Sequence, residues 1–336
     1  MSIAANPVSW GILSSAAIGL NRLVPAIAAS RNGRLLAIGT PHTERVREVA
    51  QRFGIARVYD SYEAVLADPE VEAVYNPLPN SLHHEWTRRA LEAGKHVLCE
   101  KPLALDPWEA AEMIDTARAR DRLLMEAFMY RFHPQHARVR QLIDEGAIGS
   151  IRLVRASFTF VLALDRRNIR WQRALGGGSL MDVGCYCLNA IRHYAGEPEA
   201  VLATMVVEPE TEVDATTAGV VECGEALGVF DCSFAMSGHL QLEIVGTRGR
   251  IEVPRAWLPG EVDAVIQLHR NGGANTIVVP GVDQYRLQVE NFADAIRGAA
   301  PLGLPPEDAL QNMRAIEAVR RSAARGCRVT LAEIAP

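Results

Sequence analysis

Three side chains able to carry or move charge stand in two short motifs of the sequence. Lys101 follows the apolar run 96–99 and precedes a proline, so we expect its ammonium group at the carboxyl edge of a parallel sheet. Asp182 and Tyr186 are four residues apart behind a run of glycines, a spacing that puts both on one face of a helix. A lysine charge close to a phenol lowers the phenol pKa from about 10. Lys101, Asp182 and Tyr186 are therefore candidates for acid–base chemistry.

Short apolar runs alternate with amphipathic segments through the first 130 residues, and this alternation predicts a parallel sheet covered by helices. The predicted strands are 8–13, 34–39, 71–76, 95–100 and 122–127. The predicted helices are 18–30, 43–54, 61–68, 81–94 and 106–120, with Ser81 and Asp106 as N-caps.

The pattern changes after Gly149, where consecutive strands are predicted. A hairpin turn is expected at 246–249, with its two glycines in positive-φ conformations. Helices return at 283–298 and 305–326. The expected fold class is α/β: residues 1–127 form a Rossmann domain with a doubly wound parallel sheet. Residues 128–336 form an α+β domain on a large, mostly antiparallel, open-faced sheet.

The composition argues against several classes of function. The 336 residues include 35 Lys and Arg and 40 Asp and Glu without a basic block, so we expect no nucleic-acid partner. No stretch reaches the roughly 20 apolar residues that a bilayer crossing needs, so we expect no membrane partner. The six cysteines lack a CxxC pair and regular spacing. We therefore expect neither a metal site nor a disulfide framework, and a cytoplasmic location.

The stretch GILSSAAIG has the position of a phosphate-binding loop, after the first apolar run and before a helical segment. A dinucleotide fingerprint needs three glycines, and Ser14, Ala16 and Gly19 occupy these places. The replacements are small, and a helix beginning near Ala17 would direct free N–H groups at a phosphate. The alternative is a small-residue turn without a ligand. The predicted cofactor-binding residues of this loop are Ser14, Ala16, Ala17 and Ile18.

The end of the second predicted strand bears on the choice between NAD and NADP. An acidic residue there would bind the ribose hydroxyls of NAD, whereas this strand ends without one. Thr40 offers a hydroxyl, and His42 and Arg45 follow within a helical turn, so these three residues favour NADP. Glu44 could instead turn inward and bind a ribose, which keeps NAD open.

Several motifs in this order resemble the Gfo/Idh/MocA oxidoreductases, with most similarity to the branch of dihydrodiol and D-xylose dehydrogenases. The resemblance extends over essentially the whole chain. Its motifs are WGILSSAAIG (10–19) followed by PAI (25–27), EKP (100–102), EAFMYRFHPQ (126–135) and GGGSLMDVGCY (176–186). In this branch a serine commonly replaces the first fingerprint glycine, as Ser14 does here, whereas Thr40-Pro41 replaces the usual Ser-Arg pair.

The resemblance implies roles for individual residues. Lys101 corresponds to the hallmark active-site lysine of the family. Tyr186 stands where most members carry histidine, so its phenol would be the proton donor and acceptor, while Asp182 would orient the substrate hydroxyl. Glu100 would assist on the cofactor side. Four residues of the loop 76–86 would lie along the nicotinamide ribose: Pro77, Leu78, Asn80 and His83.

The substrate side is expected in the second half of the chain and at the crossover between the halves. The resemblance places Arg131 and Phe132 on the floor of the cleft, and Trp171 could stack on a sugar ring. The predicted substrate is therefore a sugar, a polyol or a dihydrodiol. The alternative function is that of a non-catalytic regulator or sensor that binds a dinucleotide. The exposed sheet face predicts a homodimer.

Overall fold

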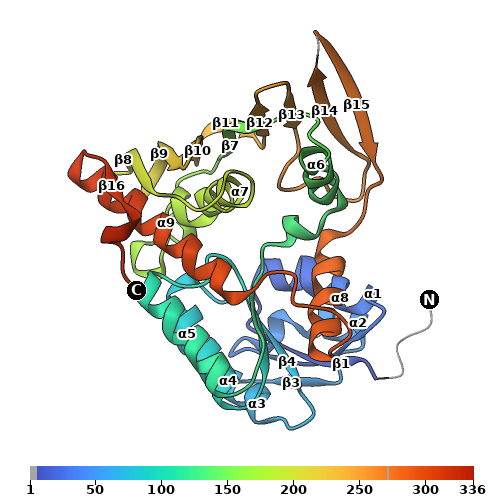
Figure 1. Ribbon diagram of the computed structural model, residues 1–336. Helices are drawn as coiled ribbons and strands as arrows, with labels where there is room; N and C mark the ends of the chain where they lie inside the picture. The colour runs from blue at the N-terminus through green and yellow to red at the C-terminus, as the bar shows by residue number, and fades with distance from the viewer. Residues whose placement is uncertain (1–5, 271) are drawn as a thin grey trace. The chain divides into compact units, whose positions relative to one another are not determined.

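The computed structural model describes residues 6–270 and 272–336, which fold into two compact units (Figure 1). The first unit contains the chain up to Phe132 together with Asp283–Leu310. The second contains His133–Val282 and Gln311–Pro336. This division differs from two continuous halves that meet at residue 127, because a late segment of the chain returns to the first unit.

The late segment belongs to the first unit through both polar and apolar contacts. Its helix α8 (Gln284–Ile296) packs on α1 (Val24–Ala29). Asp294 forms an ion pair with Arg31, and the Phe292 ring lies 5.6 Å from that of Trp10. These contacts join positions more than 250 residues apart in the chain, which local sequence patterns do not reveal.

The first unit contains a six-stranded sheet in the order β3-β2-β1-β4-β5-β6, and every strand pair is parallel. The strand order reverses between β1 and β4, so the loops at their carboxyl ends flank a crevice where ligands bind in such sheets. The strands are β1 (Val8–Leu13), β2 (Gly33–Gly39), β3 (Arg57–Tyr59), β4 (Ala73–Asn76), β5 (His96–Cys99) and β6 (Leu124–Glu126). The predicted parallel sheet is confirmed, with β3 in addition.

The helices of the first unit follow the predicted segments. Besides α8, they include α1, α2 (Arg47–Phe53), α3 (Tyr62–Ala67), α4 (His83–Glu92) and α5 (Pro107–Ala119). Asp106 caps α5 as predicted, because its side chain accepts a hydrogen bond from the Glu109 N–H. Ser81 is not a cap: it lies inside a 3₁₀ turn (Asn80–Leu82), and α4 begins at His83.

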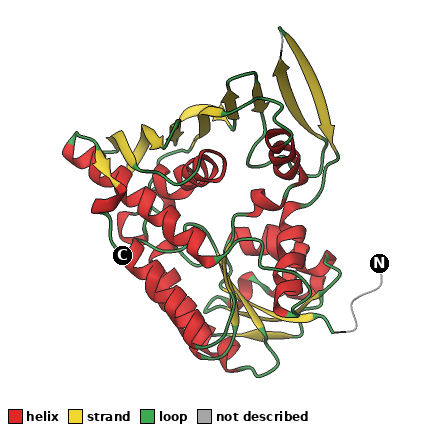
Figure 2. Ribbon diagram, viewed as in Figure 1, coloured by secondary structure: helices red, strands yellow, loops and turns green. Residues whose placement is uncertain are grey.

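The second unit contains a ten-stranded sheet that forms a continuous band in Figure 2. Its strands pair antiparallel except for β7 with β10, so the predicted mostly antiparallel sheet is confirmed. The strands are β7 (Ile151–Val161), β8 (Ala200–Val207), β9 (Asp214–Cys223), β10 (Ala226–Ser233), β11 (Ala235–His239), β12 (Leu242–Gly246), β13 (Arg250–Val253), β14 (Ala264–Arg270), β15 (Gly273–Val279) and β16 (Val329–Thr330).

One face of this sheet is covered by helices, and the other exposes apolar side chains. Helices α6 (Pro134–Asp144) and α7 (Cys185–Ala195) lie on the covered face, where α7 packs on β7 and β10 (Figure 1). Helix α9 (Pro306–Arg325) contributes the buried Ser322, whose hydroxyl accepts a hydrogen bond from the Ala203 N–H of β8. Residues on the opposite face include the exposed Leu202 and Val206.

The turn at 246–249 joins β12 to β13 as predicted, but its glycines have another physical reason. Neither Gly246 nor Gly249 has a positive φ. A Cβ at Gly246 would lie 2.2 Å from the Ile148 carbonyl oxygen, and one at Gly249 would lie 2.5 Å from the His269 carbonyl oxygen. The glycines therefore allow close backbone approach, and the expected positive φ angles were wrong.

Two further findings concern the described residues only. None of their helices combines the length and apolar composition of a membrane span. None of their six cysteines forms a disulfide, and Cys327 alone of the six is exposed.

Candidate active site

The loop that carries Lys101 follows β5 and is held by contacts on both sides of the lysine. Before it, the Tyr75 hydroxyl donates a 2.7 Å hydrogen bond to Glu100 Oε1. After it, the Leu103 N–H donates a 2.8 Å hydrogen bond to Oε1 of the buried Glu126. Tyr75 is completely buried, so the carboxylate of Glu100 is fixed from within the sheet. The backbone at Lys101 is therefore closely constrained at the carboxyl end of β5, and the role of the lysine in the reaction stays a prediction.

His83 provides a third contact to this loop. Its ring is completely buried; Nδ1 lies 2.9 Å from the Pro102 carbonyl oxygen and Nε2 lies 2.8 Å from that of Leu78. Two carbonyl neighbours favour a protonated ring, whereas burial and the Lys101 charge oppose it. Burial is the larger effect and lowers the pKa of His83 to about 4. The neutral ring thus joins the loop after β4 to the loop after β5, and its contact with a ribose stays a prediction.

The other three residues predicted in the loop after β4 differ in exposure. Pro77 is buried, as is Leu78, whereas Asn80 is half-buried at the start of the 3₁₀ turn. Pro77 lies 3.4 Å from a Cβ built on Gly19, which is an ordinary contact. At this contact distance a small side chain would fit at Gly19, the third fingerprint position, although the loops after β1 and β4 come into contact there.

The loop after β1 has the conformation of a glycine turn without the glycine. Ser14 has a φ of 75°, a region that favours glycine. Its hydroxyl accepts a 3.2 Å hydrogen bond from the Ala16 N–H, which stabilises the turn. Ala17 is exposed and Ile18 half-buried where the chain enters a π-helix, Gly19–Leu23. The loop thus offers small side chains and first-turn N–H groups at the crevice.

The turn after β2 presents its charged groups to solvent. Thr40 is completely buried, and its hydroxyl accepts a 3.2 Å hydrogen bond from the His42 N–H, so it shapes the turn. The side chains of His42 and Arg45 are more than half exposed. Glu44 lies between them, 3.8 Å from His42 Nδ1 and 4.0 Å from Arg45 Nε. The basic pair is thus accessible, and Glu44 is turned toward it.

In the second unit, Asp182 and Tyr186 occupy a continuous helical segment. It begins as a π-helix (Leu180–Gly184) and continues as α7. Oδ2 of Asp182 accepts a 2.6 Å hydrogen bond from Arg170 Nε. Arg170 lies in the segment that sequence analysis singled out for Trp171, yet the arginine itself was not predicted. The π-helix is a form often found at functional sites.

The ring of Tyr186 is fixed by aromatic neighbours that the sequence did not reveal. It lies edge-on to Phe158 with centroids 5.4 Å apart, and 6.0 Å from Trp257. The Trp257 indole N–H donates a 2.9 Å hydrogen bond to the Ser157 carbonyl oxygen, which fixes that ring in turn. Only 4% of Tyr186 is exposed, so its orientation is set by packing.

The glycines of the third motif allow protein groups to approach closely. A Cβ at Gly177 would lie 2.5 Å from the Arg170 carbonyl oxygen. One at Gly184 would lie 2.7 Å from Cys232 Sγ, so this glycine lets the helix rest on β10. These contacts give both glycines a packing reason.

The three predicted substrate residues lie in different surroundings. Trp171 is buried; its indole N–H donates to the Ala163 carbonyl oxygen at 3.0 Å, and its ring meets Phe234 edge-on. The Phe132 ring lies against Gly303, whose Cβ would be 2.5 Å from it. Arg131 is half-buried in the 3₁₀ turn Met129–Phe132. Packing thus explains Trp171 and Phe132, and a role for each at the substrate stays a prediction.

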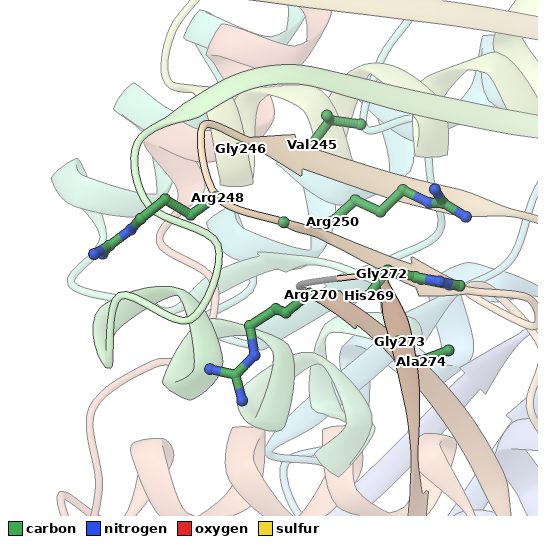
Figure 3. Close-up of a pocket in the computed structure, with 10 residues that line it drawn as sticks. Val245, Gly246, Arg248, Arg250, His269, Arg270, Gly272, Gly273 and Ala274 are labelled. Atoms are coloured by element: carbon green, nitrogen blue, oxygen red, sulfur yellow. The ribbon is translucent and has the colours of Figure 1, made fainter.

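A cavity of about 460 Å³ lies at the β12–β13 and β14–β15 hairpins. Its lining includes Arg248, Arg250, His269 and Arg270. Figure 3 shows the three guanidinium groups pointing in different directions. Arg250 also forms ion pairs with Glu243 and Glu252. The positive charges therefore do not converge on an anion, and we assign this cavity no ligand.

The described residues contain no group of three His, Cys, Asp or Glu side chains that would hold a metal ion.

Comparison with protein families finds two matches that together span most of the chain. Residues 9–128 match an oxidoreductase family with an NAD-binding Rossmann fold. Residues 136–252 match the GFO/IDH/MocA C-terminal domain. Among curated relatives, an uncharacterised oxidoreductase of Rhizobium meliloti is 40% identical over 95% of this chain and 98% of its own. The NADP-dependent D-xylose 1-dehydrogenase 2 of Haloferax volcanii is 37% identical over 96% and 99%.

A solved structure is similar over nearly the whole chain. The 3-ketoreductase KijD10 of Actinomadura kijaniata, in complex with NADP and TDP-benzene, is 34% identical and has a TM-score of 0.89, covering 94% of this chain and 98% of its own. Variants of that enzyme were solved with the same ligands; one replaces a tyrosine by phenylalanine, and others replace a lysine by alanine or glutamate.

The buried His83 predicts a pH dependence of stability. The unfolded chain takes up a proton at a pKa of about 6.5, whereas the folded ring does so only at about 4. The unfolded state therefore binds more protons between these values, and stability falls as the pH falls from about 6.5 toward 4. His83→Gln should weaken this decrease by roughly 3 kcal/mol at most at pH 4. Urea unfolding between pH 7.5 and 4 measures it.

His239→Gln is the control, because His239 is exposed on β11. It should follow the wild-type pH dependence. The wild-type slope also contains His96 and His133, whose pKa values burial likewise lowers to about 4. The His83→Gln slope must therefore be smaller without reaching zero, and an unchanged slope would contradict the neutral buried ring.

Proposed function

Because the chain belongs to the Gfo/Idh/MocA oxidoreductases, we propose that it is an NADP-preferring dehydrogenase or reductase acting on a secondary alcohol or hemiacetal carbon. The proposed substrate is a sugar, a polyol or a dihydrodiol. The observation that carries the proposal is the fixed loop around Lys101 at the carboxyl edge of a Rossmann sheet, together with Asp182 and Tyr186 in a single helical segment.

The residues of the first unit fit a dinucleotide. The left-handed turn at Ser14 and the small side chains behind it leave backbone N–H groups accessible at the crevice, the chemistry that a pyrophosphate requires. The loop after β4 and Glu100 would flank the nicotinamide ribose. When bound, the cofactor donates or accepts the hydride. The residues that would hold it are Ser14, Ala16, Ala17, Ile18, Thr40, His42, Arg45, Pro77, Leu78, Asn80, His83, Glu100 and Lys101.

We assign proton transfer to the Tyr186 phenol. In oxidation its phenolate takes the proton of the substrate hydroxyl while the hydride leaves the carbon that carries this hydroxyl, and in reduction the phenol returns the proton. We propose that the charge of the Lys101 ammonium favours the phenolate. Asp182, held by Arg170, orients the hydroxyl. KijD10 supports this choice of residue types, since its solved variants replace a tyrosine and a lysine.

The substrate class rests on the relatives. Besides the xylose dehydrogenase, they include dTDP-3,4-didehydro-2,6-dideoxy-alpha-D-glucose 3-reductases and a trans-1,2-dihydrobenzene-1,2-diol dehydrogenase, at 33–35% identity. All of these names describe carbonyl or hydroxyl chemistry on a six-membered ring or a sugar. We therefore propose a cyclic, sugar-like substrate. We also propose a cytoplasmic location, because none of the six described cysteines forms a disulfide.

The accessible basic pair supports the preference for NADP. His42 and Arg45 are exposed at the end of β2, where a 2′-phosphate would lie, and no carboxylate stands at the strand end itself. The xylose dehydrogenase of Haloferax and KijD10 are named with NADP. Glu44 offsets part of the positive charge, so we expect a preference and not an absolute selectivity.

Replacing Tyr186 tests the reaction. Tyr186→Phe should lower kcat by about 10²- to 10⁴-fold, because the proton donor and acceptor is lost while the ring remains. Lys101→Met should lower kcat similarly. The measurement is nicotinamide absorbance with NADP and NAD against aldoses, inositols and dihydrodiols, with cofactor affinity measured separately.

Tyr194→Phe is the control on the same helix. Tyr194 is buried and contacts His136 Nδ1 at 2.9 Å, so its loss should affect stability and leave kcat within about twofold. Full turnover by Tyr186→Phe would contradict the assigned role. Tight cofactor binding without turnover of any substrate by the wild type would favour a dinucleotide sensor.

Replacing Arg45 tests the cofactor preference. Arg45→Ala should raise the KM for NADP by about tenfold and leave that for NAD within about twofold, because only NADP carries the 2′-phosphate. Arg47→Ala, which removes another exposed arginine at the start of α2, should change neither value. An unchanged NADP-to-NAD ratio in a His42→Ala, Arg45→Ala double variant would refute this binding site.

The exposed face of the second sheet supports a homodimer. Leu202 and Val220 are direct neighbours across β8 and β9 and are 51% and 38% exposed. An apolar row on an open sheet face is the surface that a second copy of this chain would cover.

Leu202→Glu should raise the dimer dissociation constant at least about 100-fold, because it buries a charge without a partner. Sedimentation equilibrium measures this constant. Trp108→Glu, on the exposed face of α5, should leave it unchanged, and a wild-type monomer would refute the dimer.

A further inference from the structure

We propose that Asp214 is a positioning residue whose carboxylate anchors the turn before Asp182 and Tyr186 and thereby fixes both side chains for the reaction. The inference rests on the proposed function, since it concerns the same helical segment. Asp214 is the first residue of β9, 28 positions after Tyr186, and no motif in the sequence marks it.

One oxygen of Asp214 accepts three hydrogen bonds. Oδ2 lies 2.6 Å from Ser179 Oγ, 2.7 Å from the Leu180 nitrogen and 2.9 Å from Thr217 Oγ1. Ser179 and Thr217 are completely buried, so these bonds are shielded from water. Leu180 is the first residue of the π-helix, and a carboxylate at a helix start also interacts favourably with the helix dipole. The Asp214 carboxylate thus accepts a backbone N–H at the start of this helix, as an N-cap side chain would, but it comes from a neighbouring strand.

The other oxygen explains the last glycine of the glycine run. Gly178 has a φ of 112°, and a Cβ built on it would lie 2.1 Å from Asp214 Oδ1. A side chain at this position would therefore displace the carboxylate or the turn. Gly178 and Asp214 are therefore sterically complementary, because the Asp214 carboxylate occupies the space that a side chain at position 178 would need.

The anchored turn is linked to Asp182 through two further bonds. The Gly178 N–H donates a 2.9 Å hydrogen bond to the Arg170 carbonyl oxygen, and the Arg170 side chain donates to Asp182. The Asp182 N–H in turn donates to the Gly178 carbonyl oxygen at 3.0 Å. Gly178, Arg170 and Asp182 therefore form a closed set of contacts. A shift of the turn must move the Asp182 carboxylate, and with it the helix that carries Tyr186.

Removing the anchor tests the inference. Asp214→Ala should lower kcat by about ten- to a hundredfold through misplacement of the reacting groups, with the affinity for NADP within about twofold of wild type. Asp214→Asn keeps an acceptor of the same shape and should recover part of the loss. Kinetics at saturating NADP, a cofactor titration and the melting temperature are measured on each variant.

Asp106→Ala is the matched control. Asp106 also accepts an N–H at a helix start, that of Glu109 at 2.9 Å, but its helix α5 carries no proposed site residue. It should lower the melting temperature while kcat stays within about twofold. If Asp214→Ala lowers the melting temperature and leaves kcat as unaffected as Asp106→Ala does, Asp214 is only structural and the inference is overturned.

A second pair of variants keeps the test open if Asp214→Ala does not fold. Gly178→Ala and Gly196→Ala both place alanine at a positive φ, 112° and 99°, but a Cβ at Gly196 meets nothing within 4 Å. Only Gly178→Ala displaces the carboxylate, so only it should lower kcat, again by about tenfold or more. Equal kcat values for the two variants overturn the inference.

Amide hydrogen exchange separates this inference from the proposed function. In Asp214→Ala or Gly178→Ala, the amides of residues 179–186 should exchange faster than in the control variants, whether or not a substrate is known. Faster exchange with an inactive wild type would support the anchor and refute the proposed reaction. Unchanged exchange refutes the anchor independently of activity.

Discussion

The buried ring of His83 is the contact on which the first half of the site depends. A carbonyl oxygen that is buried without a partner costs about 1–3 kcal/mol, and the ring lies against two of them, at Leu78 and Pro102. Its neutral form carries one proton, so it donates to one of these carbonyls and packs against the other, which places the ring between the two loops. The peptide of Lys101 precedes one of these carbonyls. The backbone of Lys101 is thus held by the contacts that the loop makes on both sides of it.

The second half of the site is held by a different kind of contact. The Tyr186 ring lies against aromatic side chains, and the Asp182 carboxylate is held by Arg170. Both depend on close backbone approaches that a Cβ would prevent, at Gly177 to Arg170 and at Gly184 to Cys232. Small residues in a motif are often interpreted as space for a ligand. Here they are the condition for dense packing around the side chains that carry the chemistry.

Local patterns predicted most of the elements and failed for contacts between distant segments. The parallel sheet and the change to antiparallel pairing follow from periodicity, whereas the helix that carries Asp182 and Tyr186 was expected from their four-residue spacing behind a run of glycines. Helix α6 was not predicted. β3 was missed because it has three residues and no fully buried side chain. The return of residues 283–310 to the first unit was missed because its contacts lie far apart in sequence. For the same reason no sequence pattern marked Trp257 or Asp214 as part of the site. Arg170 was also missed, although it is adjacent to Trp171, which was predicted.

Ser14 shows why a fingerprint is better understood as a conformation than as a set of residues. The turn after β1 needs a left-handed backbone, which glycine adopts without cost and other residues at a cost of about 1–3 kcal/mol. Ser14 adopts it with a φ of 75°, and its hydroxyl accepts the Ala16 N–H, a bond that offsets part of this cost. Alanine would have the strain without the hydrogen bond, and a β-branched residue would add a steric penalty. A serine in the first fingerprint position therefore preserves the turn that the dinucleotide loop requires, and the absence of the glycine does not argue against a cofactor.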